Sequence, residues 1–275
     1  MSFLDNGAIE CHTTPYKADQ YFTIVQHGVT KRMTCSELLD ATALKLAKNM
    51  QLQGRSGHKH IDISKAFNGN PELMLRFILL FNRFTFLPRV LNRLSRLYHF
   101  DYLETNPQTQ AAICQLNQYI SEPRTPLQND YQKLIDLVVL FEKLFNINGK
   151  YIAVNLDHIK TGVPSRDILT SPNSTIELRM FHCPKSGLEI DAINKFIQGI
   201  LTLAWVELIT RKPLELAATS PFEYVNQSEQ AEKEMARLCK KIGLTFMEFH
   251  ALMRMEVTDA CTTQGGYSQD EFSAD

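Results

Sequence analysis

The chain has 275 residues, of which 44% are hydrophobic and 21% are charged. This composition is typical of a globular protein and excludes a disordered or collagen-like chain. The formal net charge of −1 creates no field that would attract the protein to nucleic acid or to an anionic membrane, so we expect neither partner.

The six cysteines lie far apart in the sequence, and no two of them form a C-x-x-C pair. We therefore expect reduced, structural thiols rather than a zinc ribbon. The N-terminus shows no secretion signal, and the most apolar stretch, residues 196–209, is too short to span a bilayer. The sequence thus predicts a cytoplasmic protein, with export by a signal of another kind as the alternative.

Apolar residues at helical spacing predict helices mainly in the middle and in the C-terminal half of the chain. The expected helices cover residues 73–84, 90–98, 131–145, 190–208 and 235–253, the last one interrupted at Gly243. Asn70 and Pro71 form a typical N-cap and first-turn pair for the first of them. We interpret the aromatic and methionine stripes of these helices as core rather than as a cofactor site.

Four segments alternate polar and apolar residues as strands do, at residues 8–12, 58–63, 151–156 and 175–180. Each has one apolar face and one face with groups that bind metals or phosphates. If all four join one sheet, its polar face forms a floor and the helices cover its back, which is an α+β arrangement. We expect a single domain over residues 1–257 and a disordered tail at 258–275.

Two pairs of polar residues on these strands could carry chemistry. His58 and His60 lie at i and i+2 and point the same way, as metal ligands must, although hydrogen-bonded structural histidines would show the same spacing. Glu177 and Arg179 also share a face and could hold a metal ion and a phosphate oxygen, or simply form an ion pair. Carboxylate and Asn neighbours favour a hard ion such as Mg²⁺ over zinc.

Taken in order, three motifs resemble those of a known family. They are Ser-Gly-His-Lys-His-Ile-Asp at 56–62, Lys-Tyr-Ile-Ala-Val-Asn-Leu at 150–156 and Thr-Ile-Glu-Leu-Arg at 175–179. The middle of the chain adds a segment in which Arg93 and Arg96 precede Tyr98. Over roughly residues 8–210, the chain resembles the amidoligases of the glutamine synthetase superfamily, which includes the glutamate–cysteine ligases. The resemblance implies a curved, mainly antiparallel sheet with helices packed on its apolar face.

The resemblance also implies an activity, namely ATP-dependent ligation of a carboxylate to an amine through an acyl phosphate. The carboxylate and amine substrates would be small molecules, peptides or proteins, and the cofactors would be ATP with Mg²⁺ or Mn²⁺. Arg179 and Glu177 would be catalytic, with Arg179 stabilising the transferring phosphoryl group. The remaining carried-over roles are metal binding by Glu10, His58 and Glu177, and cofactor binding by His58, His60, Tyr151, Asn155 and Arg179.

The sequence departs from the family pattern at two points. The family opens with a strand carrying G-x-E-x-E, which is not seen before Glu10, and the basic Lys59 separates the two histidines. An alternative is therefore a catalytically degenerate binding or effector protein on the same scaffold, and a third hypothesis is a metal-dependent hydrolase that uses His58 and His60. Without the opening strand, the edge beside Glu10 would be unpaired, so we also expect a homo-oligomer contact there.

Overall fold

The fold of the chain is that of a computed structural model, which describes part of the sequence. The described residues are 2–5, 8–11, 20–26, 28–41, 58–68, 70–84, 107–121, 136, 154–156, 174–181, 184, 186–215 and 228–253. The strands are β1 (Ser2–Asp5), β2 (Ala8–Cys11), β3 (Tyr21–Gln26), β4 (Val29–Thr34), β5 (Lys59–Asp62), β6 (Val154–Asn155) and β7 (Thr175–Leu178). The helices are α2 (Ile63–Phe67), α3 (Pro71–Arg83), α5 (Pro107–Ser121), α8 (Gly187–Ile209), α9 (Ser228–Lys241) and α10 (Phe246–Met253), and residues 35–41 are helical too. Helices and antiparallel strands thus make an α+β structure, as expected.

The strands form three antiparallel sheets. β5, β7 and β6 pair in that order, with β7 in the middle, so three of the four segments expected to share a sheet do so. The expectation that residues 8–12 join them is wrong, because β2 pairs with β1 in a separate two-stranded sheet that sets Glu10 opposite Phe3. Closing the short connection between β1 and β2 costs less chain entropy than pairing across residues 12–58, the 47 residues that separate β2 from β5.

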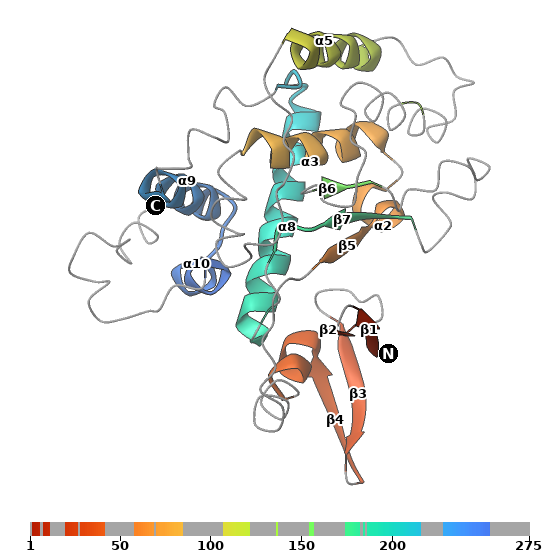
Figure 1. The fold of residues 1–275 in the computed structure, drawn as a ribbon, viewed down its shortest axis with the longest axis vertical. Helices are drawn as coiled ribbons and strands as arrows, with labels where there is room; N and C mark the ends of the chain where they lie inside the picture. The colour runs from red at the N-terminus through yellow and green to blue at the C-terminus, as the bar shows by residue number, and fades with distance from the viewer. Residues whose placement is uncertain are drawn as a thin grey trace.

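Helix α8 lies along the long axis of the molecule and is crossed by α3 (Figure 1). The sequence specifies the start of α3, since the Asn70 side chain accepts a hydrogen bond from Leu73 N at 3.0 Å and Pro71 occupies the first turn. Ser186 caps α8 in the same way by accepting from Glu189 N at 3.2 Å. Both helices were predicted from their apolar spacing, and both predictions are confirmed.

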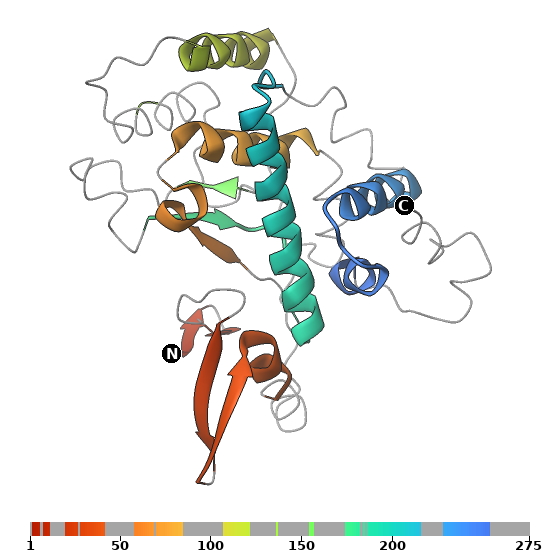
Figure 2. The same ribbon diagram turned by 180° about the vertical axis from the view of Figure 1, so that it is seen from behind.

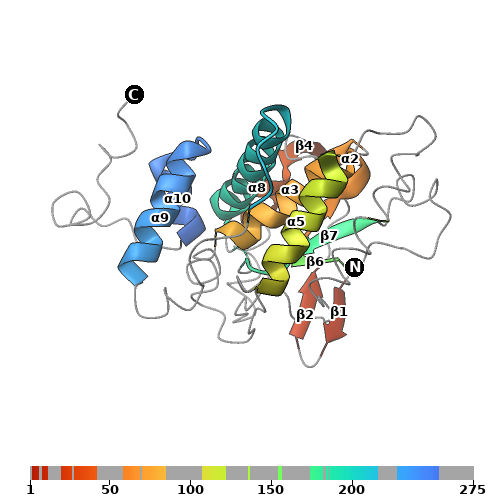
Figure 3. The same ribbon diagram turned by 90° about the horizontal axis from the view of Figure 1, so that it is seen from above.

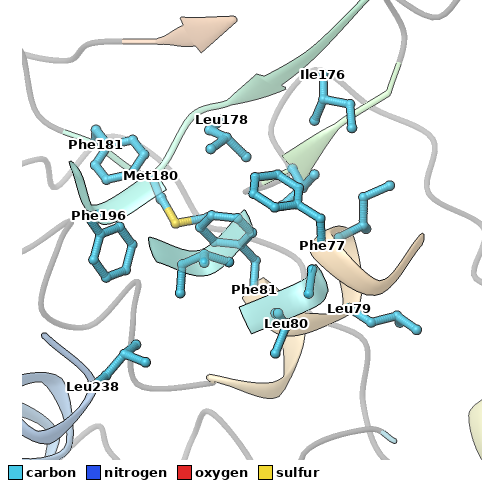
Figure 4. Packing of buried hydrophobic residues seen from close by; sticks show 14 of the residues in the cluster. Phe77, Leu79, Leu80, Phe81, Ile176, Leu178, Met180, Phe181, Phe196 and Leu238 are labelled. Carbon is cyan, nitrogen blue, oxygen red and sulfur yellow. The ribbon is translucent and has the colours of Figure 1, made fainter. Parts of the chain in front are cut away.

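The hydrophobic core lies between the three-stranded sheet and the crossing of α3 with α8 (Figure 4). Phe81 of α3 packs edge-on against Phe77 and Phe196, with ring centroids 5.0 and 6.5 Å apart respectively. Ile176 and Leu178 of β7 point into the same cluster and are fully buried. The apolar face of β7 is therefore fixed against the helices, and its polar residues must face the other way.

Helices α9 and α10 pack on the side of α8 away from the sheet (Figure 3). Gly243 separates them with a φ of +80°, a backbone conformation that glycine adopts without strain. The closest approach is at Gly199 of α8, where an added Cβ would lie 2.5 Å from Ile242 Cβ. The predicted helical stripe with a break at Gly243 is thus confirmed as two helices.

The β3–β4 hairpin lies at one end of the molecule, beside the first turn of α8 (Figures 1 and 2). The helical residues 35–41 that follow the hairpin join it to α8. The Ser36 hydroxyl hydrogen-bonds to Asp191, and Asp40 Oδ1 accepts from Gly187 N at 2.6 Å. A Cβ at position 187 would lie 2.6 Å from Asp40 Oδ2, so glycine permits this contact.

The length of α8 corrects one expectation from the sequence. The apolar stretch at 196–209 is the second half of a 23-residue helix, which is long and apolar enough to cross a membrane by length and composition. The central helix of a globular core passes the same test. Here α8 contacts α3 and α10 and carries polar contacts at Asp191 and Glu207, and 33% of its apolar window is buried in the structure.

Several expected features lie outside the described residues. These are the predicted helix at 90–98, the predicted helix at 131–145 apart from Asp136, and the tail at 258–275. In turn, the structure contains elements that the sequence patterns did not predict, namely β1, the β3–β4 hairpin, α2 and α5. α5 is held near the last turn of α8 by Asn117, whose side chain bonds to both Leu214 N and Leu214 O.

Candidate functional site

The candidate site lies on the polar face of the three-stranded sheet. The antiparallel register sets Glu177, on the central strand, between His60 of β5 and Asn155 of β6. Residues that pair across antiparallel strands point to the same face, so these three side chains lie together. Continuing the register by one residue brings His58 opposite Arg179. The structure thus gathers segments up to about 120 residues apart into one cluster, which we call the Glu177 cluster: His58, His60, Asn155, Glu177 and Arg179.

Glu177 is the centre of this cluster. Its Oε1 lies 2.7 Å from His58 Nδ1 and 3.4 Å from Arg179 Nε, and its Oε2 accepts a hydrogen bond from Asn155 Nδ2 at 2.9 Å. His60 Nε2 is more distant, at 3.9 Å from Oε1. The expected ion pair between Glu177 and Arg179 is therefore present, but it is buried rather than at the surface.

The electrostatics of Glu177 favour its charged form. Burial raises the pKa of the carboxyl, but the hydrogen bond from His58, the charges of Arg179 and His58 and the hydrogen bond from Asn155 outweigh it and lower the pKa from 4.5 to about 2. Glu177 is consequently an ionised hydrogen-bond acceptor at neutral pH. An ionised carboxylate can only accept, so His58 Nδ1 must carry the proton in their contact.

Solvent reaches the cluster from the β5 side. Glu177 and Asn155 are each 3% exposed and Arg179 is 7% exposed, whereas the side chains of His58 and His60 are 22% and 45% exposed. The polar face is therefore not an open floor, because its centre and its β6 side are covered. A ligand that arrives from solvent would meet the two imidazoles first.

The histidine pair is arranged as the alternation of the strand predicts. His60 Nδ1 lies 3.1 Å from Thr175 Oγ1, and His58 Nε2 lies 3.5 Å from Arg179 Nη2. Lys59 pairs with Leu178 on the opposite, apolar face, so this basic residue does not stand between the imidazoles. The contact of Thr175 was missed from the sequence, although its position in the same alternating segment as Glu177 was a usable signal.

Other candidate residues are placed differently or lie outside the described residues. Asn155 contacts Glu177 rather than solvent, which makes it a partner of the carboxylate. Glu10 belongs to the separate β1–β2 sheet, and its side chain is outside what the structure describes, so its role as a metal ligand stays a prediction. Tyr151, Arg93, Arg96 and Tyr98 also lie outside the described residues. β1 occupies the place before Glu10 where a strand was not expected, and its sequence, Ser-Phe-Leu-Asp, is not the family's G-x-E-x-E.

The arrangement of the cluster does not fit a divalent metal ion bound to Glu177. Both oxygens of Glu177 have an N–H partner, His58 for Oε1 and Asn155 for Oε2, and the charged guanidinium of Arg179 lies 3.4 Å from Oε1, where it would repel a metal cation. Among the described residues, no group of three or more His, Cys, Asp and Glu side chains is placed to hold an ion. The carboxylate of Asp62, the last residue of β5, instead caps α2 by accepting from Ser64 Oγ at 2.6 Å and Lys65 N at 3.1 Å.

Comparison with known proteins adds little to this geometry. No protein-family model and no curated protein matches the sequence. A solved structure, that of a bifunctional glutathione synthetase from Pasteurella multocida, is similar with a TM-score of 0.28 and 17% sequence identity. The match covers 80% of this chain but only 29% of that one, and at this TM-score the similarity carries no argument about fold or activity.

Proposed function

We propose that this protein is an ATP-dependent carboxylate–amine ligase that forms an amide or isopeptide bond through an acyl phosphate. One observation carries the proposal. The described parts of the three motifs that resemble those of the amidoligases come together in one antiparallel sheet, where His58, His60 and Asn155 converge on Glu177. The helices pack on the opposite face, as the resemblance implies.

The chemistry assigned to the residues follows from their types. Arg179 and the exposed imidazoles of His58 and His60 can donate hydrogen bonds to phosphoryl oxygens, which is how such groups recognise a nucleotide phosphate. Glu177 balances the charge of Arg179 and fixes its direction. Magnesium, which would accompany ATP, neutralises charge on the phosphates when bound. Glu10 and Tyr151 belong to the proposal only through the resemblance.

The test is to trap the acyl phosphate. Hydroxylamine converts an acyl phosphate to a hydroxamate, so the protein is incubated with ATP, Mg²⁺, hydroxylamine and a panel of carboxylates, amino acids included. We expect hydroxamate from at least one carboxylate, and a loss of at least tenfold in Arg179→Gln. Arg237→Gln makes the same chemical change at an exposed position on α9 and should leave the rate unchanged. An absence of ATP binding at millimolar concentration by calorimetry would contradict the proposal.

A second function, binding without catalysis, is favoured by the engagement of Glu177 with His58 and Arg179. A ligase of this type must neutralise a transferring phosphoryl group, and among the described residues no group of three or more His, Cys, Asp and Glu side chains is placed to hold an ion for this purpose. A degenerate member of the family would bind the nucleotide through Arg179 and the imidazoles but would form no hydroxamate. Calorimetry and the hydroxamate assay together separate the two functions, because only the ligase gives both signals.

A further inference from the structure

We propose that Glu177 is an internal counter-ion that positions His58 and Arg179, and that it is not a ligand of a divalent metal ion. The inference concerns the same site and rests on the proposed function, but it assigns Glu177 a role different from the one that the resemblance implies. Any metal ion that accompanies the nucleotide would then be held by phosphate oxygens and by groups other than Glu177.

The first support is the set of donors around the carboxylate. Oε1 receives His58 Nδ1 at 2.7 Å and lies 3.4 Å from Arg179 Nε, while Oε2 receives Asn155 Nδ2 at 2.9 Å. A metal ion bound at about 2.1 Å from either oxygen would have to share that oxygen with a donor hydrogen that already occupies one of its lone pairs. It would also stand next to the guanidinium, in a place where the low exposure of both residues weakens screening by water.

The second support is the way in which the contacts of His58 agree with one another. Because the carboxylate can only accept, His58 carries a proton on Nδ1, the ring nitrogen that faces Glu177. The other ring nitrogen, Nε2, lies 3.5 Å from Arg179 Nη2, so Glu177 and Arg179 contact opposite nitrogens of the same ring. One carboxylate thus contacts both the imidazole and the guanidinium and fixes their directions, as a positioning residue would.

The third support is the position of Glu177 in the sheet. It is on the central strand, between His60 and Asn155, and it is only 3% exposed. A metal site that exchanges with solvent needs open coordination positions, whereas the exposed groups here are the imidazoles at the β5 side. A ligand from solvent therefore meets imidazole nitrogens first, and the Glu177 carboxylate lies buried behind them.

The test uses the metal alone, so that its outcome does not depend on ATP binding or on ligation. Binding of Mn²⁺ to the protein without nucleotide is measured by electron paramagnetic resonance for the wild type, Glu177→Gln and Glu248→Gln. The last variant removes a carboxylate on α10 and controls for the change in charge. We expect the three Mn²⁺ affinities to agree within twofold. A tenfold or larger loss in Glu177→Gln alone, with the fold intact by circular dichroism, would overturn the inference.

A second readout reports the positioning role directly. In ¹⁵N-histidine spectra of the wild type, His58 should show a protonated Nδ1, the nitrogen that faces Glu177, and Glu177→Gln should reduce the fraction of rings protonated at this nitrogen. If Glu177→Gln does not fold, the wild type alone is decisive. Stoichiometric Mn²⁺ without nucleotide should leave the His58 ring signals sharp, and their disappearance would place the ion within the Glu177 cluster and refute the proposal.

Discussion

Arg83 on α3 and Glu207 on α8 form a two-point ion pair where the two helices meet. Nη1 lies 2.5 Å from Oε1 and Nη2 lies 2.9 Å from Oε2. Both side chains are largely buried, and Lys212 Nζ lies 3.7 Å from the same Oε1. This pair ties together the two helices that cover the apolar face of the sheet, so it supports the Glu177 cluster from the far side.

Removing the Arg83 side of this pair should destabilise the protein. Arg83→Met keeps the length of the side chain but leaves Glu207 largely buried without its two-point partner, and we expect a loss of about 2 kcal/mol in the free energy of unfolding. Arg237→Met breaks an exposed pair with Glu234 on α9 and should cost no more than about 0.5 kcal/mol. Urea unfolding measures both, and equal losses in the two variants would contradict the prediction.

The lowered pKa of the Glu207 carboxyl predicts that the folded protein loses stability in acid. Burial raises its pKa, but the hydrogen bond from Arg83 and the charges of Arg83, Lys212 and Arg76 lower it below the usual 4.5. Because the pKa is lower in the folded state, the stabilisation is fully present above about pH 4.5 and is lost as the pH falls through the folded-state pKa. Urea unfolding between pH 6 and pH 3 should therefore show a steeper loss of stability in the wild type than in Glu207→Gln. Parallel profiles would count against the pair.

The buried imidazole of His250 predicts a second pH range in which the folding stability changes. Its ring is 2% exposed and packs against Phe246 with centroids 4.1 Å apart, and within the described part of the chain neither ring nitrogen has a hydrogen-bond partner. Burial lowers its pKa below 6.5, so the folded state disfavours protonation, and stability is lost as the pH falls below about 6.5.

The corresponding variant is His250→Leu, which removes the two polar atoms at similar volume. We expect it to be neutral or to stabilise the protein by about 1 kcal/mol at pH 7, because a buried polar group without a partner is costly. The loss of stability between pH 7 and pH 5 should be smaller in this variant than in the wild type. A destabilisation above about 2 kcal/mol would mean instead that the His250 imidazole makes a hydrogen bond that stabilises the folded protein.

The close approach of α8 to Ile242 predicts the sign of a glycine substitution. In an exposed helix, replacing glycine by alanine stabilises by about 1 kcal/mol. At Gly199 the added Cβ would lie 2.5 Å from Ile242 Cβ, so we expect Gly199→Ala to destabilise by about 1–3 kcal/mol. Thermal unfolding measures the effect, and Gly199→Ala should cost less in an Ile242→Gly background, which lacks that Cβ. A stabilised Gly199→Ala would show that the helices are not this close.

The sequence predicted those elements whose signals are local. Helices α3, α8, α9 and α10 follow from apolar spacing. The start signals Asn70 and Pro71 and the stop signal Gly243 also act locally, within one or two helical turns. The helical residues 35–41 and α10 each follow a T-x-x-E capping signal, at Thr34 and Thr245, which could have placed their first turns. The short α2 and the polar α5 carry weaker apolar patterns and were missed.

Within the candidate site, the sequence by itself determined which residues share a strand face, because strand alternation is fixed by the backbone. His58 with His60, and Glu177 with Arg179, are pairs of this kind. Only the tertiary structure decided which strands are neighbours, since pairing depends on chain closure and on core packing that no local pattern records. In the tertiary structure, Glu10 lies in a separate sheet and Asn155 donates a hydrogen bond to Glu177. The tertiary structure also decided that the carboxylate is buried while the imidazoles are exposed, because burial is set by everything that packs around a strand and not by the strand itself.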